Sequence, residues 1–210
     1  MEPGYEEFRR VFELNKILKR ACKFLILSVI ITIAAAGITY IINPDIHGIM
    51  SNLNDRTPES IKDEEGLNKV WEYIVNNGMM VPMQMFILSL IPIQFLYLIN
   101  IIVTVTLPGI LFGIIFQFDL GKGMSMMISS IPHYLFEVFA FCIFAAVLFE
   151  LNKSLRLKIK TVLKKEEQML FISSTVITTV KTYILLVLPL IITAALLETY
   201  IADVIYKILQ

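Results

Sequence analysis

Charged residues are scarce in this chain. Asp, Glu, Lys and Arg make up 17% of its 210 residues, whereas soluble domains usually carry about 25%. Between Met79 and Phe118 the chain has no charged side chain at all. In contrast, hydrophobic residues make up 57% of the sequence and the mean hydropathy is +0.74. This composition argues against an ordinary soluble domain and predicts an all-α protein that crosses the membrane several times.

The sequence also lacks the common signatures of chemistry. It has 2 cysteines, and because Cys22 and Cys142 both lie within or beside apolar stretches, neither suggests a disulfide framework or a metal cluster. There is no Gly-rich phosphate loop, no H-E-x-x-H zinc motif and no nucleophile with a neighbouring base. We therefore expect no enzyme activity, no cofactor and no bound metal. At this length we expect one membrane domain, without a separate soluble enzyme.

Positive charge predicts the number and direction of the spans. Twelve of the 18 Lys and Arg lie in two groups, at residues 9–23 and 153–165. Cytoplasmic flanks collect Lys and Arg, so both groups should face the cytoplasm and an even number of spans should separate them. One span needs about 20 apolar residues, so the uncharged stretch from Met79 to Phe118 should supply two. The N-terminus is then inside and the C-terminus outside. The five predicted spans cover residues 24–43, 79–97, 101–118, 132–150 and 182–203.

The segments outside the spans differ in charge. Residues 44–78 form a predicted acidic outer loop, whereas residues 152–168 form a basic, amphipathic inner segment. A further amphipathic helix is predicted at residues 1–22, on the cytoplasmic side of a membrane domain at 23–210. This asymmetry argues against nucleic-acid binding and for the bilayer, with its anionic inner leaflet, as a partner. The inner segment should contact the membrane surface or dock a partner protein through Arg156, Lys158, Lys160, Lys164 and Lys165.

Glycine and turn residues suggest how the spans meet. Gly109 and Gly113 form a G-x-x-x-G spacing, which would let another helix approach the backbone closely. The chain should turn near Asn100 between the second and third spans. Residues 119–130 are expected to form a short outer loop, since they include two glycines and a pair of serines.

Three ionisable residues fall in the outer third of the predicted spans: His133, Glu137 and Glu198. His133 and Glu137 are four residues apart and share a helix face, and Glu198 should lie at the same depth on the antiparallel last span. Such groups are costly in a bilayer, so each is a candidate functional residue. They could form a structural hydrogen-bonded cluster, relay protons or bind a substrate group; a metal site has too few ligands to be favoured. Glu150, at the inner end of its span, is expected to pair with Lys153 or water.

Two short elements carry a family resemblance. Residues 132–137, Pro-His-Tyr-Leu-Phe-Glu, resemble the P-H-G-x-x-E element of the stage II sporulation protein M-like membrane family, with Tyr134 where glycine is usual. Residues 194–201 resemble its A-A-x-x-E-aromatic element. The paired asparagines before the second span and the basic segment after the fourth fit the same plan. The likeness extends over about residues 15–203.

This resemblance implies a membrane scaffold or transport partner rather than a reaction. The sporulation member acts with cell-wall hydrolases during engulfment. Relatives resemble partners of ABC exporters or occur with the production, export and immunity of circular bacteriocins. We therefore expect a multi-pass cell-membrane protein that organises or assists a larger complex. The alternative is a permease-like subunit of an ABC-type exporter whose ATPase is a separate chain. Expected partners are another membrane protein, a cytoplasmic ATPase or a second copy of this chain.

Overall fold

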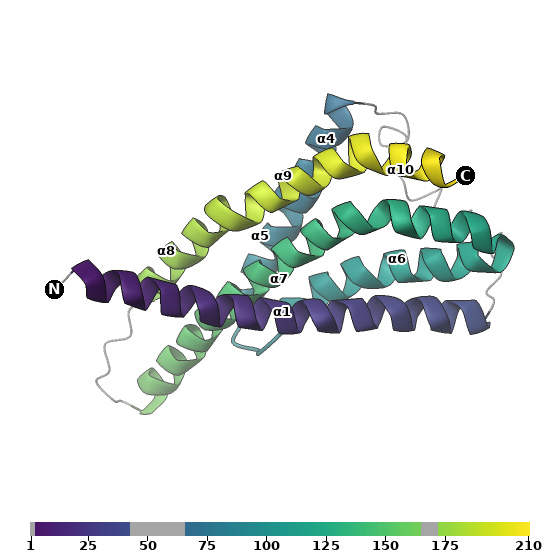
Figure 1. Ribbon diagram of the computed structural model, residues 1–210. Coiled ribbons are helices and arrows are strands. Elements are labelled where there is room, and N and C mark those ends of the chain that lie inside the picture. Colours follow the sequence, from purple (N-terminus) through teal and green to yellow (C-terminus); the bar gives the residue numbers. More distant parts are fainter. Residues whose placement is uncertain (1–2, 43–65, 165–171) are drawn as a thin grey trace.

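The computed structural model describes residues 3–42, 66–164 and 172–210, with side chains from Asn15 onward (Figure 1). Within these ranges the chain is helical almost throughout and contains no strand, which confirms the all-α class. Four continuous helical stretches are long and apolar enough to cross a membrane. They are Asn15–Ile42, Leu98–Phe118, Leu120–Lys164 and Ile172–Leu209.

The first helix, α1 (Pro3–Ile42), joins the predicted amphipathic segment to the first span without a break. Neither glycine nor proline stands between the two predicted segments, so nothing in the sequence interrupts the helix. Its last carbonyls accept hydrogen bonds from Gln117, whose Nε2 lies 2.9 Å from the oxygens of both Thr39 and Tyr40. A side chain of another helix thus satisfies carbonyl groups that a helix end leaves unpaired.

The helical run that corresponds to the predicted second span ends earlier than expected. The helical run α4 (Leu67–Tyr73), η1 (Ile74–Met80) and α5 (Val81–Leu90) ends at Leu90, seven residues before the predicted end at 97. Pro92 explains the difference, because a proline disfavours helical backbone at the residue before it, and Ile91 is extended. The chain therefore turns before Asn100. The last part of the predicted outer loop is helical, whereas residues 43–65 lie outside the described residues.

Helices α6 (Leu98–Phe118) and α7 (Leu120–Lys164) are joined by Asp119 alone. The expected loop at 119–130 is therefore wrong, since all but its first residue belong to α7. Asp119 explains the early start, because its Oδ1 accepts a hydrogen bond from the backbone N–H of Lys122 at 3.0 Å and caps the new helix. The predicted fourth span and most of the basic inner segment continue as the same helix.

The C-terminal run covers the predicted fifth span. It consists of α8 (Ile172–Thr182), η2 (Tyr183–Val187), α9 (Leu188–Leu196), η3 (Leu197–Ile201) and α10 (Ala202–Leu209), which follow one another without a break. In Figure 1 this run lies on one side of α7, together with α4 and α5, while α1 and α6 lie on the other.

The core is built around α7. Every residue from Ala140 to Leu148 is buried, and α7 contacts α1, α5, α6 and each part of the C-terminal run. The outward faces are apolar too: Ile33 on α1, for example, is 66% exposed. Apolar surface on both the inside and the outside is typical of helices that lie in a bilayer.

Candidate functional site

Ionisable side chains from separate helices meet where α7 passes the C-terminal run. His133 of α7 places Nδ1 2.9 Å from Oε2 of Glu198 in η3. The other oxygen of Glu198, Oε1, lies 3.7 Å from Nζ of Lys69 in α4. Glu198 is therefore held between an imidazole and an ammonium group from two different helices. All three side chains keep part of their surface exposed.

Glu137 is the more deeply buried acid, with 9% of its surface exposed. The phenol of Tyr73, the last residue of α4, donates a hydrogen bond to its Oε2. The three residues predicted as one cluster are thus divided between two neighbouring pairs. His133 pairs with Glu198, and Glu137 pairs with Tyr73, which was not part of the prediction. The helix α4 contributes one partner to each acid.

Lys69 and Tyr73 are the site residues that the sequence analysis missed, because it placed them in the outer loop. A signal was available: the two are four residues apart and so share one face of a helix. The apolar residues of the same helix differ in exposure, since Val70 is buried and Trp71 is exposed.

Two π-helical segments, η1 and η3, border the two pairs, and a third, η2, contacts η1. η1 begins directly after Tyr73, and η3 contains Glu198. η2 begins with Tyr183, whose hydroxyl donates to the carbonyl oxygen of Gly78 in η1. Such segments are rare, leave carbonyl groups out of register and are frequently found at functional sites. The backbone around the acids is therefore irregular on two sides.

The arrangement can exchange protons more readily than it can bind a metal. A carboxylate beside an imidazole, and a second one beside a phenol, are groups that accept and release protons. Among the described residues no group of three or more His, Cys, Asp or Glu side chains is placed to hold a metal ion.

A second polar contact joins α1 to α7 at the opposite end of the bundle. Glu150 was expected to pair with Lys153 or water, and the structure gives it Arg20 of α1, with its NH1 2.8 Å from Oε1. Arg20 also lies over the ring of Phe149, with 3.9 Å between the guanidinium carbon and the ring centroid. Arg20 was not predicted as a partner; the unbroken α1 passes alongside α7 and brings it within reach.

Asn152 is a buried residue that the sequence analysis did not single out. Its Nδ2 donates to the carbonyl oxygens of Ser89, at 2.9 Å, and Ile91, at 2.7 Å. These carbonyls lie at the end of α5, where the helix leaves them without a helical partner. Arg156 in turn donates from Nε to Oδ1 of Asn152 at 2.9 Å. One side chain of α7 thus fixes the break between α5 and α6.

The predicted docking residues differ in whether they are bonded within the protein or exposed. Arg156 is engaged with Asn152 and with Gln94, whose Oε1 lies 3.1 Å from its NH1. Lys158, Lys160 and Lys164 are exposed on the last turns of α7. Lys165 lies outside the described residues.

The two glycines of the G-x-x-x-G spacing face α1. A Cβ atom added to Gly109 would lie 2.5 Å from the carbonyl oxygen of Thr32, and one added to Gly113 would lie 2.5 Å from that of Ala36. Both distances are far below van der Waals contact. The backbones of α1 and α6 therefore approach as closely as two helices with glycine at the contact allow.

Comparison with known families supports the resemblance drawn from the motifs. The family model described as Stage II sporulation protein M matches residues 23–203, which include every side chain of the two acid pairs. The chain belongs to this family. No curated protein and no solved structure matches it.

Proposed function

We propose that this member of the stage II sporulation protein M family is a non-enzymatic component of the cell membrane that organises a larger membrane complex. The observation that carries the proposal is the C-terminal end of α7, residues 157–164, among the described residues. Its last turns extend away from the other helices in Figure 1 and expose Lys158, Lys160 and Lys164. Val162 and Leu163 on the same turns are 68% and 78% exposed. A projecting surface that combines cations with apolar side chains suits a partner helix or groove.

Charge reversal at the end of α7 tests this proposal. Replacing Lys158, Lys160 and Lys164 together by Glu should abolish co-purification with a membrane or cytoplasmic partner, because the surface would repel an acidic contact. The matched control replaces Lys122 and Lys207 by Glu, since both are exposed and lie away from this end. Both variants are checked for insertion into the membrane. If the triple variant inserts and still co-purifies, the segment serves only as a contact with the membrane surface.

The proposed topology has five spans, with the N-terminus inside. In Figure 1, α1 and α6 run in the same direction, α7 runs back, and the C-terminal run returns. The run α4–η1–α5 provides the second crossing in this scheme, although it is not among the four long apolar stretches. Together with the two positively charged groups, these directions support the predicted orientation.

Thiol labelling in intact cells measures the orientation. Cys22 is exposed and is first replaced by Ser, whereas Cys142 is buried. In this background Ser51→Cys, in the predicted outer loop, should react with an impermeant maleimide. Ser154→Cys, in α7, should react only after the cells are permeabilised. Labelling of Ser154→Cys from outside would overturn the topology.

The alternative function is that of a permease-like subunit of an ABC-type exporter with its ATPase on a separate chain. The two acid pairs favour it, since ionisable groups within membrane helices often serve transport. An ATPase that co-purifies with this chain and whose hydrolysis rate depends on Glu137 or Glu198 would support the exporter. Co-purified cell-wall hydrolases would support the organising role instead.

A further inference from the structure

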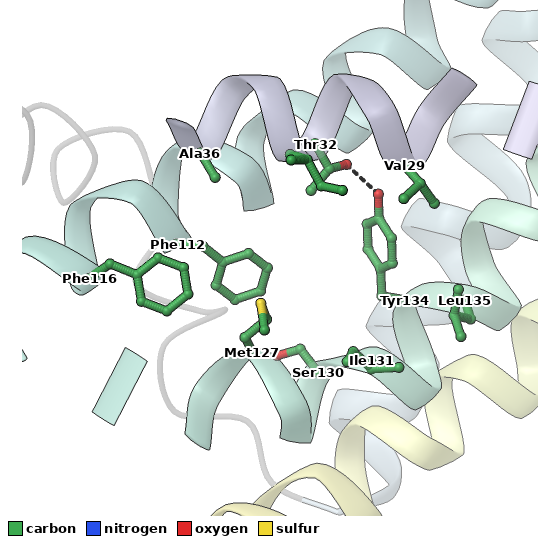
Figure 2. A pocket seen from close by; sticks show the side chains of 11 residues that line it. Val29, Thr32, Ala36, Phe112, Phe116, Met127, Ser130, Ile131, Tyr134 and Leu135 are labelled. Atoms are coloured by element: carbon green, nitrogen blue, oxygen red, sulfur yellow. Dashed lines mark hydrogen bonds between the residues drawn. The ribbon is translucent and has the colours of Figure 1, made fainter. Parts of the chain in front are cut away.

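A cavity of about 320 Å³ lies between α1, α6 and α7, and no residue of the two acid pairs lines it (Figure 2). Side chains from all three helices point into it, and none of them is charged. Two aromatic rings of α6 form one wall, at a centroid distance of 6.5 Å. The lining includes Thr32 and Ala36 of α1, Phe112 and Phe116 of α6, and Ser130 and Tyr134 of α7.

The hydroxyl groups at the cavity are already paired within the protein. Thr32 lies 2.5 Å from the hydroxyl of Tyr134 and 3.0 Å from the carbonyl oxygen of Val105. Ser130 donates to the carbonyl oxygen of Met126 at 2.8 Å. A buried water molecule needs two to four polar partners, and these groups leave it few. The chemistry of the walls therefore selects an apolar occupant.

The cavity is a consequence of how the three helices are held apart. α1 is fixed against α6 at Gly109 and Gly113. The ring of Tyr134 stands between α7 and α1, with its hydroxyl bonded to Thr32, and so closes one end of the cavity and keeps the helices separated (Figure 2). An empty space of this kind deprives the side chains around it of dispersion contacts, so an apolar guest that fills it is favoured.

The mouth of the cavity opens onto an apolar surface. Three residues both line the cavity and are exposed on the outside: Ile33 of α1, and Ile131 and Leu135 of α7. In a membrane protein this surface is in contact with lipid chains. Apolar cavities of about 150 Å³ bind benzene, so a cavity about twice that size has room for several carbons of an aliphatic chain. We propose that this cavity binds one acyl chain of a membrane phospholipid.

The binding does not depend on the proposed organising role. Because the bilayer interior is as apolar as the cavity, transfer between them brings no hydrophobic gain. What holds the chain is its fit against the rings of Phe112, Phe116 and Tyr134. A bulky side chain placed in the cavity should therefore displace the lipid chain without affecting a partner bound elsewhere.

Photo-crosslinking in vesicles tests the proposal. The full-length protein is reconstituted in phosphatidylethanolamine and phosphatidylglycerol, with a trace of phosphatidylglycerol that carries a diazirine in one acyl chain. After illumination, mass spectrometry compares lipid adducts on Met127 and Tyr134 with adducts on Ile41, an exposed reference residue on α1. We expect the cavity residues to be labelled at least as strongly as Ile41. Absence of labelling in the cavity would refute the proposal.

Two alanines of the same helix provide a matched pair of variants. Ala36→Phe places a ring in the cavity, whereas Ala34→Phe places the same ring on an exposed position of α1 that does not line it. The ring and an acyl chain cannot occupy the same space, so Ala36→Phe should lower the ratio of cavity to reference adducts about tenfold, which corresponds to about 1.4 kcal/mol. Ala34→Phe should leave it unchanged. Equal ratios in the two variants would overturn the proposal.

A second filling variant covers the case in which Ala36→Phe does not fold. Ser130→Leu adds volume from α7, and because the hydrogen bond that Ser130 donates to Met126 lies within its own helix, the loss to the fold is small. It should lower the same adduct ratio. If neither Ala36→Phe nor Ser130→Leu lowers the ratio although both variants fold, the lipid proposal is wrong.

Discussion

Two interfaces of this bundle hold their helices by different means. α1 and α6 meet through backbone, at Gly109 and Gly113, where an added Cβ would collide with a carbonyl oxygen. α7 and the C-terminal run meet through side chains, with His133 beside Glu198. In a bilayer apolar surface gives no net drive for helices to associate, so packing and hydrogen bonds must provide it. The first interface depends on the absence of a side chain and the second on the chemistry of particular ones.

The largest effect is expected at the glycine interface. Gly113→Ala should lower the free energy of unfolding by about 2–3 kcal/mol, because α1 must move away from α6. Thermal unfolding in detergent measures the change. Gly37→Ala is the matched control: its added Cβ would meet nothing within 4 Å, and replacing a helical glycine should stabilise by about 0.5–1 kcal/mol. Similar destabilisation by both substitutions would show that the close approach does not support the fold.

A smaller effect is expected at Glu198, where two substitutions separate structure from transport. Glu198→Leu should destabilise by about 1–3 kcal/mol, because His133 and Lys69 lose their shared acceptor. Glu198→Gln keeps a hydrogen-bonding side chain and should change the unfolding temperature little.

Activity of the Gln variant then decides between the two interpretations. Export or complex assembly is measured in cells that carry the partner proteins. We expect Glu198→Gln to be stable and active, as a structural pair requires. A stable but inactive Gln variant would contradict this and favour a group that carries protons or binds substrate.

The smallest effects are expected for the two partners that α4 supplies. Tyr73→Phe removes the donor to the buried Glu137 and should lower the free energy of unfolding by about 1–2 kcal/mol. Lys69→Met removes an ion pair at 3.7 Å between partly exposed groups, and such pairs contribute about 0–1 kcal/mol. Chemical unfolding of both variants measures the difference. A larger loss for Lys69→Met would mean that Glu198, rather than Glu137, anchors α4.

The course of the chain shows where sequence patterns were sufficient. The apolar stretches predicted the long helices. The end of α5 could also have been predicted, because Pro92 disfavours helical backbone at the residue before it. The prediction of a loop at 119–130 was wrong because a single capping aspartate, Asp119, is enough to start a helix directly. Glycine and serine content gave the wrong impression there, since a following apolar stretch can carry such residues into a long helix.

The polar contacts were harder to predict. Glu137 and Glu198 were recognised as costly residues, but their partners Tyr73 and Lys69 were assigned to a loop. Tyr73 is 64 residues from Glu137, and Arg20 is 130 residues from Glu150. No local spacing reports contacts over such separations.

The sequence by itself determined that this is an all-α membrane protein of a known family, because apolar length and family motifs can be read along the chain. The energetic cost of exposing or burying each segment in a bilayer accumulates residue by residue, without reference to neighbouring helices. Only the tertiary structure decided which donor each acid receives, that Asn152 fixes the end of α5, and that Tyr134 leaves a cavity beside it. These features depend on distances between side chains of separate helices, and those distances exist only once the helices have packed.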